Sequence, residues 1–283
     1  MTNIVVACDG SEHAQKALGW ARELARSVPE PVLHLVHAYH VPLPISEGMA
    51  IEYARTLQEA REDGQELLDR MAASVEGVPV RTHLRQGAAA PAVLAVADEV
   101  GAGLIAMGSR GLGLAASLFL GSVSTEVVHH ARVPVLVARH DHARPLRRVL
   151  VGVDGSAHSA RALAFALRWA PEAEITALHV LHLSPEARAL FEQTDLSFDV
   201  AVDRAARDVV NRTADLARVP ADRVRPLAAT GSAADQLLAE YRTGGYDLAV
   251  VGSRGLGLLG ELFLGSVSER LVRLAPGPVV VVK

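Results

Sequence analysis

Two copies of one glycine-rich loop carry the residues best suited to chemistry in this sequence. In the first copy Gly108 and Gly111 stand three residues apart, and Gly121-Ser122 follows at the start of a helical pattern. The second copy keeps this spacing 144 positions later, as Gly252, Gly255, Gly265 and Ser266. Glycine lets main-chain amides approach a ligand closely, and a helix N-terminus adds unpaired N–H groups and a positive dipole end. Each copy therefore predicts an anion site, most naturally for phosphate.

The glycine loops could also be flexible connectors, part of a dinucleotide-binding motif or a P-loop, and the sequence argues against each of these. Their glycines could serve only as turns in a flexible connector, but the two halves differ widely elsewhere while the loops keep nearly every residue, which favours ligand binding. The stretch from Gly255 to Gly260 matches a dinucleotide fingerprint, yet it follows the fourth strand of its half instead of the first. The motif G-x-x-x-x-G-K-[ST] does not occur. A dehydrogenase and a P-loop protein are thus disfavoured.

The helix that follows each loop is expected to present its first turn to the anion. Ser266 and Glu269 have the spacing of a capping box, which predicts that Ser266 caps the second of these helices. Gly121 and Ser122 would offer main-chain N–H groups and a hydroxyl. Arg110 and Arg254 could add positive charge, although arginines in such loops often point into solvent.

One aspartate in each half follows the first apolar run. Asp9 and Asp154 each open an Asp-Gly-Ser segment, 145 positions apart. Such an aspartate can simply cap a turn or a helix. It can also place a carboxylate at the sheet edge, where it would accept hydrogen bonds from ribose hydroxyls or meet a metal. The position beside the predicted phosphate loop favours this second role.

Strand and helix patterns alternate along both halves. Apolar runs predict strands at 4–8, 32–38, 80–86, 104–107, 133–138, 149–153, 178–182, 246–251 and 278–282. The segment 178–182 (LHVLH) resembles 33–37 (LHLVH). Alternation of this kind predicts parallel sheets covered on both faces, with ligands at the carboxyl ends of the strands. We therefore expect domains at 1–140 and 147–283, a linker at 141–146, and one site between the first and fourth strands of each domain.

Composition narrows the class of protein. The 283 residues suit two domains, and 50% are hydrophobic while 4% are aromatic, so the cores should be aliphatic. A net charge of −4 without a basic stripe argues against nucleic-acid binding. One cysteine suits a reducing compartment, and neither a signal peptide nor a membrane-length apolar run occurs. These features predict a soluble cytoplasmic protein without membrane contact.

The spacing G-x2-G-x9-G-[ST] behind a fourth strand, with an aspartate after the first, resembles the universal stress protein family. The resemblance covers essentially the whole chain as two tandem copies. It implies an adenine-nucleotide alpha-hydrolase-like fold, a doubly wound five-stranded parallel sheet of order 3-2-1-4-5 in each domain, and the ATP-binding branch of the family, with Mg²⁺ as a conceivable companion. Asp9 and Asp154 would then lie near ribose or adenine, and main-chain atoms of Ala38 and Leu183 near adenine. The phosphate residues would be Gly108, Arg110, Gly111, Gly121, Ser122 and Val123, and Gly252, Arg254, Gly255, Gly265, Ser266 and Val267.

The resemblance also implies a role and a mode of pairing. The family uses its last strand for pairing, so 133–138 and 278–282 could join the two domains or build a homodimer. The expected function is ATP-dependent regulation in stress adaptation through an unknown protein partner. A slow ATPase or nucleotide hydrolase, and a partner-binding module without a ligand, remain as alternatives. We assign no catalytic residue, and the twelve histidines show no spacing specific for a metal site.

Overall fold

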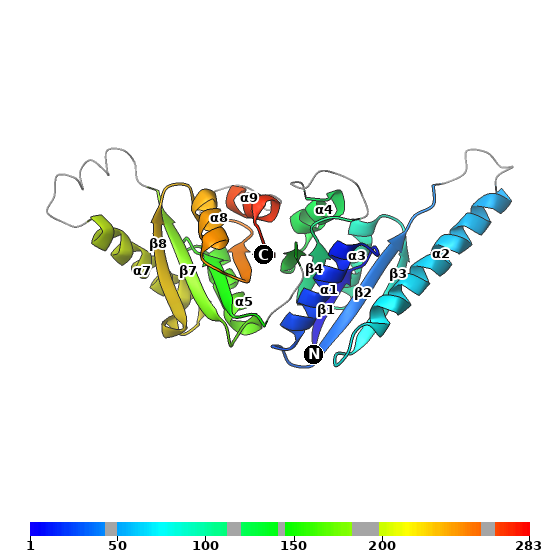
Figure 1. Cartoon of the computed structure of the whole chain (residues 1–283), viewed down its shortest axis with the longest axis horizontal. Coiled ribbons are helices and arrows are strands. Elements are labelled where there is room, and N and C mark those ends of the chain that lie inside the picture. The colour runs from blue at the N-terminus through cyan, green and yellow to red at the C-terminus, as the bar shows by residue number, and fades with distance from the viewer. Residues whose placement is uncertain (43–49, 112–119, 141–144, 183–197, 256–263) are drawn as a thin grey trace. The chain divides into compact units, whose positions relative to one another are not determined.

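The computed structural model describes residues 1–42, 50–111, 120–140, 145–182, 198–255 and 264–283. The chain divides into two compact units, Met1–His142 and Ala143–Lys283. Within the described ranges each unit holds five parallel strands with helices on both faces (Figure 1). The predicted fold class, a tandem pair of doubly wound parallel sheets, is confirmed.

The first unit has the strand order β3-β2-β1-β4-β5. Its strands are β1 (Thr2–Ala7), β2 (Pro31–Tyr39), β3 (Val80–Gln86), β4 (Leu104–Gly108) and β5 (Val135–Ala138). Its helices are α1 (Glu12–Ala25), α2 (Ala50–Ala73), α3 (Ala89–Glu99) and α4 (Ser122–His130). Right-handed crossovers place α1 and α2 on one face of the sheet, and α3 packs beside α4 on the other.

The second unit repeats this order as β8-β7-β6-β9-β10. Its strands are β6 (Arg148–Gly152), β7 (Glu174–Leu181), β8 (Val224–Thr230), β9 (Leu248–Gly252) and β10 (Val279–Val282). Its helices are α5 (Ala157–Trp169), α7 (Phe198–Ala217), α8 (Ala233–Thr243) and α9 (Ser266–Leu274), and a short 3-10 helix, η2 (Ala221–Arg223), precedes β8. In each unit the first three strands are added toward one edge of the sheet, and the fourth and fifth toward the other edge. The order of the strands therefore changes direction between the first and fourth strands, and this is where doubly wound sheets bind ligands.

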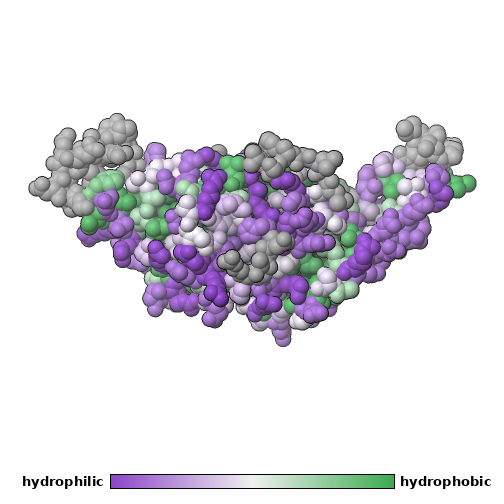
Figure 2. Space-filling model, viewed as in Figure 1, coloured by the Kyte–Doolittle hydropathy of each residue, from purple (hydrophilic) through white to green (hydrophobic). Residues whose placement is uncertain are grey.

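Aliphatic side chains build the core of each sheet. Ile4, Val5 and Val6 on β1 are fully buried, as are Val149, Leu150 and Val151 on β6. A central parallel strand is covered on both faces, so it needs apolar residues without alternation. Each such side chain stabilises the fold by about 1.5–3 kcal/mol. The helices turn polar residues outward, as the hydrophilic surface of α2 shows (Figure 2).

Strand pairing corrects one expectation about the repeat. Ile4 on β1 pairs with Leu33, whereas its counterpart Val149 on β6 pairs with Ile175. Residues of β7 therefore stand 142 positions after their β2 counterparts, not 145. The similar letters at 33–37 and 178–182 are thus not structurally equivalent.

Two histidines verify this corrected register. His37 uses Nδ1–H to donate to the carbonyl of Cys8 at 2.7 Å, and His179 donates in the same way to the carbonyl of Val153 at 2.9 Å. Both acceptors directly follow the first strand of their unit. His179, and not His182, is therefore the counterpart of His37.

Within the described part of the chain, no helix combines the length and the apolar character that a membrane span requires.

Candidate functional site

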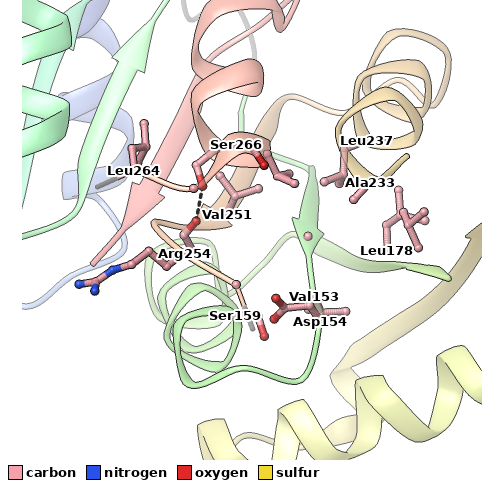
Figure 3. A pocket seen from close by; sticks show the side chains of 17 residues that line it. Val153, Asp154, Ser159, Leu178, Ala233, Leu237, Val251, Arg254, Leu264 and Ser266 are labelled. Atoms are coloured by element: carbon pink, nitrogen blue, oxygen red, sulfur yellow. Dashed lines mark hydrogen bonds between the residues drawn. The ribbon is translucent and has the colours of Figure 1, made fainter. Parts of the chain in front are cut away.

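Each unit has a cavity at the carboxyl ends of its first, second and fourth strands. The cavity of the first unit measures about 410 Å³ and that of the second about 260 Å³. Figure 3 shows the second cavity, with Leu178, Ala233 and Leu237 gathered on one side and Arg254 on the other. The first and fourth strands meet here in each sheet, so both cavities lie where the sequence places a ligand.

The two carboxylate oxygens of Asp9, and likewise those of Asp154, have different surroundings. Oδ1 of Asp9 accepts the main-chain N–H of Ser11 at 3.0 Å, and Oδ1 of Asp154 accepts that of Ser156 at 2.9 Å. These serines in turn cap α1 and α5. Oδ2 of each aspartate instead faces the glycine loop. One oxygen therefore shapes the turn, and the other faces the cavity wall.

The carboxylate leaves no room for a side chain at the second glycine of each loop. A Cβ on Gly111 would overlap Oδ2 of Asp9, and a Cβ on Gly255 would overlap Oδ2 of Asp154. An alanine would push the carboxylate away from the loop. The close approach of the main chain to an aspartate oxygen therefore requires glycine here.

The first glycine of each loop is required by helix packing. A Cβ on Gly108 would lie 2.6 Å from Cβ of His13, and one on Gly252 would lie 2.8 Å from Cβ of His158. Both histidines stand in the first turn of the helix that follows the Asp-Gly-Ser segment. These glycines therefore let α1 pack on the end of β4, and α5 on the end of β9.

At Gly121 and Gly265 a Cβ would meet no comparable overlap with the residues that the structure describes. Their φ angles are −64° and −67°, which any L-residue adopts. A Cβ on Gly121 would meet Cα of Arg110 at 3.4 Å, and one on Gly265 would meet the carbonyl oxygen of Ser253 at 3.3 Å. The described residues thus leave nearly enough room for a side chain at both positions. A ligand that approaches the main chain would explain why both are glycine.

These same glycines are the N-caps of α4 and α9, and neither helix has a side-chain cap. The capping box predicted at Ser266 is therefore wrong: the extended conformation at Gly265 makes Ser266 the first helical residue. Gly121 and Gly265 donate their own N–H groups to the carbonyls of Ser109 and Ser253 at 2.9 and 2.7 Å, which holds each helix start over its cavity.

The first turn of α4 and α9 keeps main-chain donors available. The N–H groups of residues 122–124 and 266–268 form no hydrogen bond with any part of the chain that the structure describes. The hydroxyls of Ser124 and Ser268 are used elsewhere, because they donate to the carbonyls of Gly108 and Gly252 at 2.8 and 2.7 Å. Three unpaired N–H groups at the positive end of a helix dipole make the start of each helix chemically suited to an anion.

Positive charge lies beside both cavities. Arg110 and Arg254 line them, and Figure 3 shows the guanidinium of Arg254 pointing away from Asp154. Burial, reinforced by nearby cationic side chains, lowers the pKa of His13 and of His158. Both rings are therefore neutral at pH 7, and the arginines carry the charge next to the loops. Among the described residues, no group of three or more His, Cys, Asp or Glu side chains is arranged to hold a metal ion.

Most of the site residues predicted from the sequence line one of the two cavities. The first is lined by Asp9, Ala38, Gly108, Arg110, Gly111, Gly121, Ser122 and Val123. The second is lined by Asp154, Gly252, Arg254, Gly255, Gly265, Ser266 and Val267. Leu183 lies outside the described residues. By strand register Val180 is the counterpart of Ala38, and it lines the second cavity.

Sequence reasoning missed the apolar side of both sites. It is formed by Val36, Ala89 and Val93 in the first unit and by Leu178, Ala233 and Leu237 in the second. These residues come from the end of the second strand and from the first turns of α3 and α8. Counting from the strand pairing, instead of from similar letters, would have found the strand residues. The helix residues carry no distinctive signal in the sequence.

Comparison with known proteins assigns the family. A model of the universal stress protein family matches residues 1–139 and again residues 145–283. The chain therefore belongs to the universal stress protein family, as a tandem pair of its domains, and the resemblance noted in the sequence is confirmed.

Individual relatives show the same organisation. A universal stress protein of Mycolicibacterium smegmatis is 29% identical over 297 residues, covering 99% of this chain and 96% of the relative. A universal stress protein of Thermus aquaticus is 38% identical over 137 residues, which cover 48% of this chain and 97% of the relative. A crystal structure of a universal stress protein from Archaeoglobus fulgidus superposes with a TM-score of 0.71 at 24% identity, covering 99% of this chain and 98% of the other. The fold is thus shared over its full length, and one unit corresponds to a whole single-domain relative.

Proposed function

We propose that this chain is an ATP-binding regulatory protein with one nucleotide site in each unit. The observation that supports the proposal is the glycine at each helix N-cap, Gly121 and Gly265, which is required neither by the backbone conformation nor by a severe overlap with any described residue. Beside each of them lie unpaired N–H groups at a helix start. A phosphate chain fits both features, because it accepts several N–H bonds and needs the space that a Cβ would fill.

The rest of each cavity suits the remainder of a nucleotide. The Oδ2 atoms of Asp9 and Asp154 are placed to accept hydrogen bonds from ribose hydroxyls. The apolar residues at the ends of β2 and β7, facing α3 and α8, suit the flat faces of a base. Apolar walls with few polar groups are typical of small-molecule sites. Adenine would therefore lie away from the helix N-termini, and the triphosphate against them.

Regulation fits these sites better than hydrolysis. Of the described residues that line each cavity, Asp9 or Asp154 is the carboxylate, and its Oδ1 is committed to the turn. Hydrolysis requires a group that positions the attacking water and compensation for charge in the transition state. A site made mainly of main-chain donors binds phosphate without supplying the first of these. We therefore propose that the nucleotide state, not its turnover, carries the signal in stress adaptation.

The test is to denature the purified protein, identify any released nucleotide, and titrate the emptied protein with ATP by calorimetry, with and without Mg²⁺. We expect two equivalents of ATP per chain. Gly121→Val should remove one equivalent and Gly265→Val the other, because each isopropyl group would occupy the phosphate position. Ser122→Ala keeps the main-chain donors and should weaken binding by about tenfold at most.

Three outcomes would decide against this proposal. Absence of released nucleotide together with absence of heat on addition of ATP would refute nucleotide binding. Unchanged stoichiometry in both valine variants would place the ligand elsewhere. Turnover of many ATP molecules per chain, abolished by the same variants, would favour the ATPase alternative.

A further inference from the structure

The two cavities differ on the side that faces away from the helix N-termini. Val36 and Ala38 stand two apart on β2, so they share one face of the sheet, as do Leu178 and Val180 on β7. In each unit this face packs against the helix that follows the third strand, α3 or α8. At three corresponding positions the second unit has the larger residue: Val36 and Leu178, Ala38 and Val180, and Val93 and Leu237.

Part of this extra volume is absorbed by the surrounding structure. Behind Leu237 the second unit has Gly152 where the first has Ala7, and a Cβ on Gly152 would lie 3.1 Å from Cδ1 of Leu237. Val251 is also smaller than its counterpart Met107. No corresponding reduction accompanies Val180 among the described residues that line its cavity. The isopropyl group of Val180 therefore takes space that the methyl group of Ala38 leaves open.

The unit with the larger apolar side chains has the smaller cavity. The first cavity, of about 410 Å³, lies within the range of about 300–1,000 Å³ that is usual for small-molecule sites, and the second, of about 260 Å³, lies below it. The phosphate side differs little, since Gly108, Arg110, Gly111, Gly121 and Ser122 all have identical counterparts. Among the described residues, the difference is therefore located where a base would lie.

We propose that the two sites differ in how well they accommodate the base of the nucleotide. Val180 is the residue that restricts the space for the base in the second site. This inference rests on the proposed function, because it assumes that the cavities take nucleotides. Both sites would hold a triphosphate equally well. The first would also accommodate adenine, whereas the second would have to rearrange Leu178, Val180 and Leu237 to do so. Forcing extra volume into a packed site is unfavourable. We expect ATP to bind the second site at least about tenfold more weakly, which corresponds to about 1.4 kcal/mol.

The experiment measures each site alone in the full-length protein. Gly265→Val leaves the first site, and Gly121→Val leaves the second. Each single-site protein is titrated with ATP and with inorganic tripolyphosphate, which has the same charged groups but no base. We expect the Kd for ATP to differ by tenfold or more between the two proteins, and the Kd for tripolyphosphate to be the same within about twofold.

Exchange of one side chain then tests the cause. Val180→Ala in the second-site protein should tighten ATP binding by about threefold to tenfold, and Ala38→Val in the first-site protein should weaken it by a similar factor. Neither exchange should change the Kd for tripolyphosphate. Both positions are half-buried at the ends of their strands, so the fold should tolerate either residue. Val200→Ala, the same substitution on an exposed part of α7, is the matched control and should change neither Kd.

The possible failures are distinguishable. Equal affinity of both single-site proteins for ATP would overturn the inequality and leave the proposed function intact. A parallel change in ATP and tripolyphosphate affinity after either exchange would show that position 38 or 180 acts on the phosphate side, which also overturns the inference. If neither protein binds ATP or tripolyphosphate while both keep the fold by circular dichroism, the proposed function fails and this inference fails with it.

Discussion

The two candidate sites of this protein are nearly identical at one end and different at the other. At the end formed by the glycine loops, glycines, arginines and the start of the following helix recur at a spacing of 144 positions. At the opposite end, Ala38 becomes Val180 and Val36 becomes Leu178. The glycine end is built from main-chain contacts at close approach, where one extra carbon has no room. The apolar end is built from side chains that can change size while the sheet stays the same.

The sheets themselves differ at one buried polar position. His34 on β2 is 2% exposed, whereas its counterpart on β7 is Thr176. His34 contacts Oδ1 of Asn3 through Nε2 at 3.1 Å and Nε2 of His83 through Nδ1 at 2.9 Å. The amide nitrogen of Asn3 donates to the carbonyl of Val100, so its Oδ1 must accept. His34 therefore carries its proton on Nε2, and His83 donates to Nδ1. The counterpart position on β7 holds a threonine, which does not titrate in this pH range.

The largest expected difference between the units is their response to acid. Burial, with smaller contributions from His83 and Arg81, lowers the pKa of His34 from about 6.5 to about 4. Between these values the unfolded chain binds more protons than the folded one, so stability falls as the pH falls. From pH 7 to pH 5 the first unit should lose about 2 kcal/mol more than the second. Amide hydrogen exchange of β2 and β7 peptides, corrected for intrinsic rates, measures this.

Replacing the histidine by the residue of the other unit provides the control. His34→Thr should remove most of the difference, because the buried titrating group is gone. The pKa values of His13 and His158 are lowered at corresponding positions of the two units, so both units respond to acid in the same direction there. Equal loss of protection in the two units on acidification would show that the His34 cluster does not set the acid stability.

An effect of comparable size should separate the glycines within one loop. Gly108→Ala places a methyl group against the main chain of His13, and we expect it to destabilise the first unit by about 1–3 kcal/mol. Gly121→Ala meets only ordinary contacts, so it should leave the melting temperature nearly unchanged while weakening ATP binding. Thermal unfolding and calorimetry of both variants, and of Gly252→Ala and Gly265→Ala, give the comparison in each unit. If Gly121→Ala lowered the stability as much as Gly108→Ala, the assignment of these roles would be wrong.

The smallest expected effect concerns the two aspartates. Asp9→Ala removes the acceptor for the N–H of Ser11 and should cost about 1 kcal/mol of stability, and Asp154→Ala should cost the same. Asp9→Asn keeps an oxygen for the turn but removes the charge and one acceptor from the cavity side. The asparagine variant should therefore keep its stability and lose ATP affinity, as read by thermal unfolding and calorimetry. Unchanged affinity would restrict Asp9 to shaping the turn.

Much of the fold could be predicted from the sequence because it depends on local patterns. Continuous apolar runs identified the central strands, and the segment 80–86 became β3 with the expected bounds. Alternation of strands and helices was enough for the parallel, doubly wound sheet, since right-handed crossovers leave few other arrangements. The glycine side of each cavity could be predicted because its glycines and the following helix are close together in the chain.

The errors arose where residues meet across the sheet. Similar letters at 33–37 and 178–182 suggested the wrong equivalence, because strand register is set by pairing with β1 and β6 and not by composition. Ser266 had the spacing of a cap, but the extended conformation of Gly265 moved the helix start by one residue. The apolar wall of each site could not be read from any motif, because it combines a strand end with a distant helix.

The sequence by itself determined the class of fold, the tandem repeat and the positions of the glycine loops, since each depends on spacing along one segment. The tertiary structure separated the roles of the glycines: Gly108 makes room for a helix and Gly111 for a carboxylate, whereas a Cβ on Gly121 would meet no severe overlap with the described residues. It also decided that Ala38 corresponds to Val180. These distinctions depend on which atoms come within van der Waals contact, and a chain reveals that only once its strands are paired and its helices packed.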